Sequence, residues 1–202
     1  MYNLGYACVN MSLSYPREWG DKPKGTLRIT TNRSMIRKTF DAKGLPYASE
    51  LTLQNCLDLE RIIQWNEEND IKFYRMSSNL VPWHSEFELE DLPDFRAIAA
   101  SLRRAGDLAK LYGQRITTHP GPFNKLTSPQ PHVITNTITD LENHGRIFDL
   151  MRLPRTPYAK INIHVGAHYN NKPMAIDNFC RNFERLSDSV RSRLTVENDD
   201  KP

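Results

Sequence analysis

Short apolar, β-branched segments alternate along the chain with longer segments in which apolar residues recur every three or four positions. The first pattern is typical of buried strands and the second of amphipathic helices. The predicted strands are residues 2–9, 71–78, 114–119, 159–166 and 193–199. The predicted helices are residues 51–66, 95–112, 128–151 and 176–190. Alternating strands and helices predict an α/β fold with a parallel sheet.

Turn-forming residues set several of the expected boundaries. Gly113 is expected to close the second helix, and Ser128 to cap the third helix with Pro129 in its first turn. The Gly-, Pro- and Lys-rich residues 10–47 predict a long loop with a helical turn near Met35.

Two parallel architectures fit this order of elements. A doubly wound sheet usually carries a glycine-rich phosphate loop after its first strand, and this chain has none. A (β/α) TIM-type barrel is therefore favoured, with residues 1–202 as a single domain. Because a complete barrel has eight strands, five strands predict a partial barrel with an open edge. Either another chain completes this barrel, or the fragment is weakly stable and prone to associate through the edge.

The composition places the chain among globular proteins, with 39% hydrophobic and 25% charged residues. It lacks an apolar run of membrane-spanning length and a signal-peptide pattern, so we expect a cytoplasmic protein without a membrane partner. An odd number of cysteines without CxxC spacing argues against disulfides and thiolate metal sites. We expect Cys8, Cys56 and Cys180 to be buried free thiols.

The distribution of charge is more informative than the net charge of +3. Residues 10–45 carry an excess of five positive charges, which could lie along phosphates or simply face solvent. The basic residues are Arg17, Lys22, Lys24, Arg28, Arg33, Arg37, Lys38 and Lys43.

Three chemically active side chains stand where successive predicted strands end. His119, His164 and Glu197 each follow β-branched residues and precede a turn former. Because parallel strands end on one edge of a sheet, these side chains should converge there. Imidazole and carboxylate together suit zinc, manganese or iron, although each residue alone is more often a polar plug or a solvated edge residue.

Other strand ends and the remaining histidines are less distinctive. The first strand leads to Tyr6 and Asn10, and the second to His84 and Glu86. We expect the two helical histidines on the surface, whereas the loop histidine after the fourth strand is left unassigned. These residues are His132, His144 and His168.

Five motifs, in this order and spacing, resemble the UV damage endonuclease family of DNA repair. They are "LGYACVN", "FYRMSSNLVP", "YGQRITTHPGPF", "INIHVGAHYNNK" and "LTVENDD". The resemblance implies a β/α barrel related to endonuclease IV and the sugar isomerases. It also implies a divalent metal cluster, manganese before zinc or magnesium, that nicks double-stranded DNA 5′ to UV photoproducts.

The resemblance also implies roles for individual residues. His119 and His164 would be metal ligands, and Glu197 would bridge metals. Tyr6 would be a catalytic-site residue and Asn10 a contact near the lesion. Further ligands would come from three more strands.

The chain departs from the family pattern at two places. Pro122 and Phe123 stand where the family usually has Gln-Tyr, side chains that probe the duplex opposite the lesion. Glu86 stands where the family tends to have a histidine, and His84 is the nearest imidazole, so either residue could fill this catalytic position.

Two other functions fit the same sequence features. A sugar isomerase or epimerase of the same barrel superfamily would use histidine, glutamate and a divalent metal. A non-catalytic DNA-binding remnant would bind DNA without nicking it. Steep salt dependence would distinguish DNA binding from binding of a neutral sugar.

Overall fold

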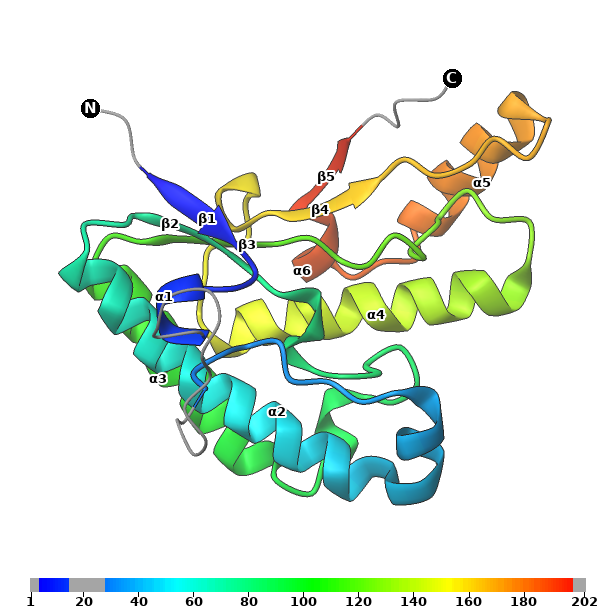
Figure 1. Ribbon diagram of the computed structural model, residues 1–202. Helices are drawn as coiled ribbons and strands as arrows, with labels where there is room; N and C mark the ends of the chain where they lie inside the picture. Colours follow the sequence, from blue (N-terminus) through cyan, green and yellow to red (C-terminus); the bar gives the residue numbers. More distant parts are fainter. Residues whose placement is uncertain (1–3, 15–27, 198–202) are drawn as a thin grey trace. The chain divides into compact units, whose positions relative to one another are not determined.

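The computed structural model describes residues 4–14 and 28–197. Five strands form one parallel sheet in the order β1-β2-β3-β4-β5 (Figure 1). They are β1 (Gly5–Ala7), β2 (Phe73–Met76), β3 (Arg115–Thr118), β4 (Ile161–His164) and β5 (Leu194–Glu197). All five predicted strands are present, and within the described residues each is shorter than its predicted segment.

The strand order decides between the two architectures left open by the sequence. In a doubly wound sheet the order reverses at a switch point, whereas in a β/α barrel each strand lies beside the next one along the chain. The observed order follows the chain without reversal. The fold is therefore of the α/β class, with five strands arranged as in a parallel β/α barrel.

Helices connect the strands. They are α1 (Met11–Ser14), α2 (Arg37–Glu68), α3 (Phe95–Leu111), α4 (Pro131–Leu150), α5 (Lys172–Phe183) and α6 (Asp188–Arg191), with short 3-10 turns at Ser78–Leu80, Leu89–Asp91 and Pro157–Ala159. In the described ranges, no helix combines the length and apolar character needed to cross a membrane.

The chain forms two compact units, and each is described by itself. Unit 1 comprises residues 1–82 and 90–116, and unit 2 comprises residues 83–89 and 117–202. The expectation of a single domain over residues 1–202 stays a prediction.

In unit 1, β1 pairs in parallel with β2, and α2 packs along α3 (Figure 1). The apolar positions that predicted these helices form the core between them. The fully buried residues include Leu59, Ile62, Ile63, Ile98, Leu102 and Ala105. The C-terminus of α3 is as predicted: Gly113 has a φ of 63°, and Gln114 N–H donates to the Ala109 carbonyl at 2.8 Å.

The start of α2 corrects the sequence prediction. Residues 37–50 were expected to belong mainly to a loop, but they are helical. Gly44, with a φ of 61°, and Pro46 kink this helix instead of preceding it. An ion pair one turn apart, Arg37–Asp41 at 2.8 Å, supports the segment before the kink. The predicted loop 10–47 is thus interrupted by α1 and ends before Arg37.

In unit 2, two helix boundaries also differ from the predictions. Helix α4 begins at Pro131, because the Ser128 hydroxyl accepts from the nearby Gln130 N–H in a local turn and does not cap the helix. The single helix expected over 176–190 is two helices, α5 and α6. Ser187 starts the second by accepting a hydrogen bond from Val190 N–H.

The cysteines are only partly as expected. All three thiols are free, but only Cys56 is buried, Cys8 is half-buried and Cys180 is exposed. The general expectation of burial was wrong for Cys180 because its position on α5 faces solvent.

Candidate metal centres

One candidate centre lies at the carboxyl ends of neighbouring strands in unit 2. His164 and Glu197 are the last residues of β4 and β5 and are paired in register, and His119 directly follows β3. The parallel arrangement therefore brings the three predicted side chains together at one edge. We call His119, His164 and Glu197 the strand-end cluster.

The donor atoms of the strand-end cluster are close enough to share an ion. Glu197 Oε1 lies 3.2 Å from His119 Nε2 and 3.1 Å from His164 Nδ1. The two imidazole rings are 5.1 Å apart between centroids, and one ligand atom from each residue lies within 4.8 Å of the others. Two nitrogens and a carboxylate at this separation can hold a divalent transition metal.

Neighbouring polar groups fix the Glu197 carboxylate. The Asn162 amide donates to Glu197 Oε2 at 2.6 Å, and the Thr195 hydroxyl donates to Asn162 Oδ1 at 2.7 Å. The hydrogen bond from His119 is the main cause that lowers the pKa of Glu197 below its usual value. The carboxylate is therefore ionised at neutral pH and held in one orientation.

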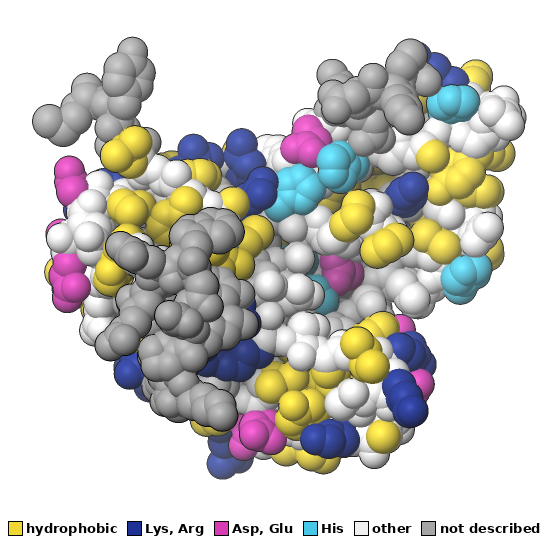
Figure 2. Space-filling view, in the orientation of Figure 1, with side chains coloured by type: hydrophobic (Ala, Val, Ile, Leu, Met, Phe, Trp, Pro, Cys, Tyr) yellow, Lys and Arg dark blue, Asp and Glu magenta, His cyan; other side chains and the backbone are white. Residues whose placement is uncertain are grey.

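The strand-end cluster is open to solvent. Side-chain exposure is 41% for Glu197, 36% for His164 and 18% for His119. On the loop after His119, Pro122 is exposed and Phe123 is 86% exposed. Figure 2 shows histidine and acidic side chains meeting at the surface. Such a position leaves room for a large substrate to approach.

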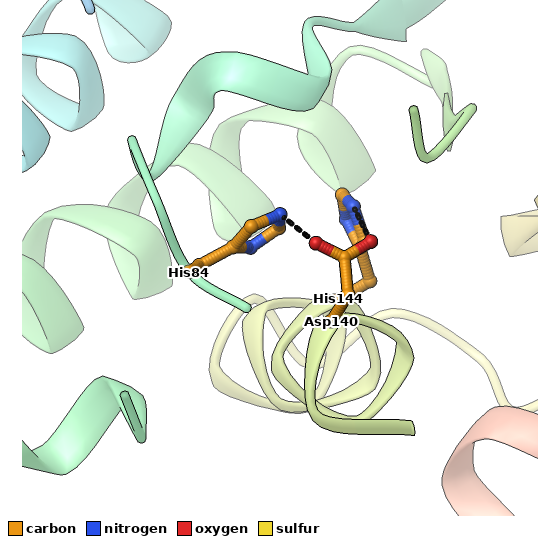
Figure 3. Close-up of side chains that lie close together, drawn as sticks. All are labelled: His84, Asp140 and His144. Carbon is orange, nitrogen blue, oxygen red and sulfur yellow. Dashed lines mark ion pairs between the residues drawn. The ribbon is translucent and has the colours of Figure 1, made fainter. Parts of the chain in front are cut away.

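A second group of possible ligands is buried in unit 2. His84 lies in the loop of residues 83–89, and Asp140 and His144 lie one turn apart on α4 (Figure 3). Asp140 Oδ1 is 2.6 Å from His84 Nε2, and Asp140 Oδ2 is 3.9 Å from His144 Nε2. We call His84, Asp140 and His144 the buried cluster.

Burial and close contacts set the protonation of the buried cluster. Burial acts to raise the pKa of Asp140, but its interactions with His84, His144 and Asn124 together outweigh burial and lower this pKa to about 2. Burial is the main cause that lowers the pKa of His144 to about 3. At neutral pH the cluster thus contains a carboxylate and a neutral His144 imidazole, the forms that bind metals.

The buried cluster corrects one prediction and adds a residue that the sequence analysis missed. His144 was expected on the surface but is only 2% exposed, because the polar face of α4 packs inside unit 2. Asp140 was not singled out, although the spacing of Asp140 and His144 in "DLENH" places both on one helix face. Glu86 is exposed, in contrast to the buried His84. His132 and His168 are exposed.

In unit 1, the structure brings Tyr6 and Asn10 together. The Tyr6 hydroxyl donates to Asn66 Oδ1 at 2.8 Å and accepts from the Asn10 amide at 2.9 Å. Burial raises the pKa of Tyr6 to about 12, so its phenol is a donor at neutral pH and not a base. Asn10 is 3% exposed.

The structure describes only part of the positively charged residues 10–45. Arg17, Lys22 and Lys24 lie outside the described residues. Arg33 forms an ion pair with the buried Asp58 at 2.7 Å, so this guanidinium has a partner within unit 1. For the described part of the segment, ion pairing within the unit therefore accounts for some of the positive charge.

The fold and the strand-end cluster together define the class: a β/α-barrel protein with a candidate metal centre at the carboxyl ends of its strands. A sequence model described as UV-endonuclease UvdE matches residues 2–202. The chain belongs to the UvdE family, which confirms the resemblance seen in its motifs.

Curated relatives and a solved structure agree with this assignment. The UV-damage endonuclease of Schizosaccharomyces pombe is 35% identical over 199 residues, covering 98% of this chain and 31% of the relative. The UV DNA damage endonuclease of Bacillus anthracis (strain A0248) is 34% identical over 200 residues, covering 98% and 59%. The crystal structure of SacUVDE matches with a TM-score of 0.79 and 28% identity, covering 100% and 62%. The chain thus spans less than two thirds of each of these proteins.

Proposed function

We propose that the protein containing this chain is a metal-dependent endonuclease that nicks double-stranded DNA 5′ to UV photoproducts during DNA repair. The single observation that carries the proposal is the strand-end cluster, in a chain of the UvdE family. Relatives named UV-damage endonuclease support the substrate. Family membership favours this activity over that of a sugar isomerase or epimerase of similar fold.

The residues of the strand-end cluster fit a divalent metal. His119 and His164 would supply neutral nitrogens, and Glu197 has one oxygen near both rings and a second oxygen to share with a further ion. Manganese suits this mixed nitrogen and oxygen set, with zinc or magnesium as alternatives. A bound divalent ion supplies an activated water and polarises the phosphoryl group.

Residues beside the ligands would keep them oriented. His119 Nδ1 lies 3.0 Å from the Pro120 carbonyl, and with a metal bound, donation from Nδ1 to this carbonyl would leave the Nε2 lone pair for the ion in place of the hydrogen bond to Glu197. Asn162 holds the opposite side of the carboxylate at 2.6 Å. Such outer contacts fix the tautomer of a histidine ligand and the direction of a carboxylate ligand.

We assign the remaining predicted residues to positioning and recognition. Tyr6 would be a catalytic-site residue whose hydroxyl is oriented by its hydrogen bonds with Asn66 and Asn10, and the resemblance places Asn10 near the lesion. For the catalytic position that the sequence left open between His84 and Glu86, Glu86 is the candidate that could face a substrate, because its side chain is exposed whereas His84 is buried.

DNA recognition would rest on exposed groups and on the damage itself. Phe123 can stack on a base, whereas Pro122 offers no side-chain hydrogen bond. A damaged pair stacks poorly, so bringing it into the site costs less than opening an intact pair. Basic residues of the 10–45 segment would neutralise phosphates, and binding should weaken steeply with salt.

The experiment compares His119→Ala and His164→Ala with the matched control His132→Ala, an exposed histidine at the start of α4. Manganese content and nicking of UV-irradiated duplex are measured on each purified protein. We expect both to fall in the two cluster variants and to stay unchanged in the control. Wild-type metal content in both cluster variants would contradict the ligand assignment, and DNA binding without nicking at any manganese concentration would indicate a non-catalytic protein.

A further inference from the structure

The buried cluster has the geometry of an ion site that is separate from the strand-end cluster. Asp140 and His144 are four residues apart on α4 and project from one face, and His84 approaches from a loop (Figure 3). One ligand atom from each side chain lies within 4.8 Å of the other two. We propose that His84, Asp140 and His144 form a second metal site, which binds one zinc-class divalent ion.

Hydrogen bonding within the cluster leaves buried nitrogens without partners. Among the described residues, His84 Nδ1 and His144 Nε2 have no hydrogen-bond partner. Each such buried group costs about 1–3 kcal/mol. His144 Nε2 is 3.9 Å from Asp140 Oδ2, too far for a hydrogen bond. Two ligands bound to zinc at about 2.0–2.2 Å are separated by roughly 3–4 Å, so an ion between His144 Nε2 and Asp140 Oδ2 would give this nitrogen a partner.

Polar neighbours hold the Asp140 and His144 side chains of α4 in orientations in which both could bind one ion. The Asn124 amide donates to Asp140 Oδ2 at 2.6 Å, and the Thr118 hydroxyl lies 3.4 Å from His144 Nδ1. The Thr118 contact leaves Nε2 as the nitrogen that faces Asp140. Supporting contacts of this kind accompany metal ligands in proteins.

The backbone around the third ligand is held as well. The Asn143 amide donates to the carbonyls of His84 and Phe87 at 2.6 and 2.9 Å, and Leu89 N–H donates to Asn143 Oδ1 at 3.1 Å. The loop that carries His84 is therefore attached to α4 beside Asp140 and His144. The ion would add a further link between this loop and the helix.

The two clusters differ in access. The side chains of His84, Asp140 and His144 are each at most 10% exposed, whereas the strand-end side chains reach 41%. A DNA phosphate cannot reach so buried an ion, so the second site would stabilise unit 2 and not bind the substrate. Thr118, which contacts His144, directly precedes His119. The ion would thereby support the strand end that presents the first ligand of the strand-end cluster.

The test begins with a protein that lacks the strand-end site. His119→Ala/His164→Ala is purified, equilibrated with zinc and dialysed, and its zinc is counted; cobalt is then substituted as a spectroscopic probe. We expect one ion per chain and a visible cobalt absorption of low coordination number. Adding His84→Gln, Asp140→Asn or His144→Gln should remove both signals. Adding His132→Ala, the matched control on α4, should leave both unchanged.

A variant of Asn124, which contacts a proposed ligand but is not itself one, should weaken zinc binding by less than the ligand variants do. Adding Asn124→Ala to the His119→Ala/His164→Ala protein should weaken zinc affinity about 10- to 100-fold, and each ligand variant should weaken it more. Circular dichroism and urea unfolding verify that each variant is folded. If all ligand variants fail to fold, X-ray absorption of the ion in His119→Ala/His164→Ala decides, and two imidazoles with one carboxylate would support the proposal.

Several results would overturn the proposal. These are no zinc or cobalt in the folded His119→Ala/His164→Ala protein, an unchanged ion in all three ligand variants, or X-ray absorption without imidazole. The buried cluster would then be a hydrogen-bonded triad only. None of these readouts uses nicking, so the result is independent of the proposed endonuclease activity.

Discussion

Asn143 holds the loop that carries His84, and its removal should destabilise unit 2 measurably. The side chain is 1% exposed and makes three hydrogen bonds, to the carbonyls of His84 and Phe87 and from Leu89 N–H. In Asn143→Ala, three backbone groups lose their partners, and each unsatisfied buried group costs about 1–3 kcal/mol. Because water can enter the space left by the amide, we expect each of the three groups to cost about 1 kcal/mol, the lower end of this range. The free energy of unfolding should therefore fall by about 3 kcal/mol.

The variant Asn143→Asp tests the two hydrogen bonds that Asn143 donates separately from the one that it accepts. Aspartate still accepts from Leu89 N–H but cannot donate, and its charge faces two carbonyl oxygens. At pH 7 it should destabilise at least as much as alanine. Protonation at low pH restores one donor, so part of this loss should be recovered.

Urea unfolding, followed by circular dichroism, measures both variants. Asn136→Ala, an exposed asparagine on the same helix, is the matched control and should change stability by less than about 0.5 kcal/mol. A loss of less than about 1 kcal/mol in Asn143→Ala, the worth of a single hydrogen bond, would refute the reasoning. So would an Asn143→Asp protein as stable as wild type at pH 7.

Further predictions concern the core and the exposed loop. Arg193, fully buried, donates to Asp149 at 2.9 Å and to three backbone carbonyls, so Arg193→Met should cost about 3–5 kcal/mol in urea unfolding; an unchanged midpoint would show that these contacts contribute nothing. Burial acts to raise the pKa of Asp149, but hydrogen bonds from Arg155 and Arg193 outweigh it and lower this pKa. This stabilisation is therefore complete above the unfolded pKa of about 3.9 and is lost as pH falls through the lower folded pKa. Asp149→Asn should reduce the loss of unfolding free energy as pH falls below about 3.9. An unchanged pH dependence in this range would contradict the role given to Asp149. Pro122→Gln should increase the preference for damaged over intact duplex in a binding titration, while Phe123→Ala should weaken stacking by about 1–3 kcal/mol; no change in either would exclude the loop from recognition.

Much of the architecture follows from local patterns. The predicted strand segments are short, the last three each contain at least two β-branched residues, and each predicted helix has an apolar face, so their alternation predicts a parallel sheet. The strand-end cluster was predictable for the same reason, because His119, His164 and Glu197 stand at the carboxyl ends of three successive strands.

The differences arise where tertiary contacts decide. Gly44 and Pro46 resemble loop residues, but in the structure they kink a helix. The buried cluster could not be predicted, because the polar face of α4 is buried by contacts distant in sequence. His84 is separated from Asp140 by 56 positions, and only the folded loop brings them within 2.6 Å.

The most direct test of the central claim uses an end-labelled duplex with one UV photoproduct, the same duplex without damage, and the full-length protein that contains this chain, supplied with manganese. The account predicts one nick immediately 5′ to the photoproduct, little cleavage of the intact duplex, and no nick with Glu197→Gln or after metal removal. Equal cleavage of both duplexes, or none by the metal-loaded protein, would contradict it.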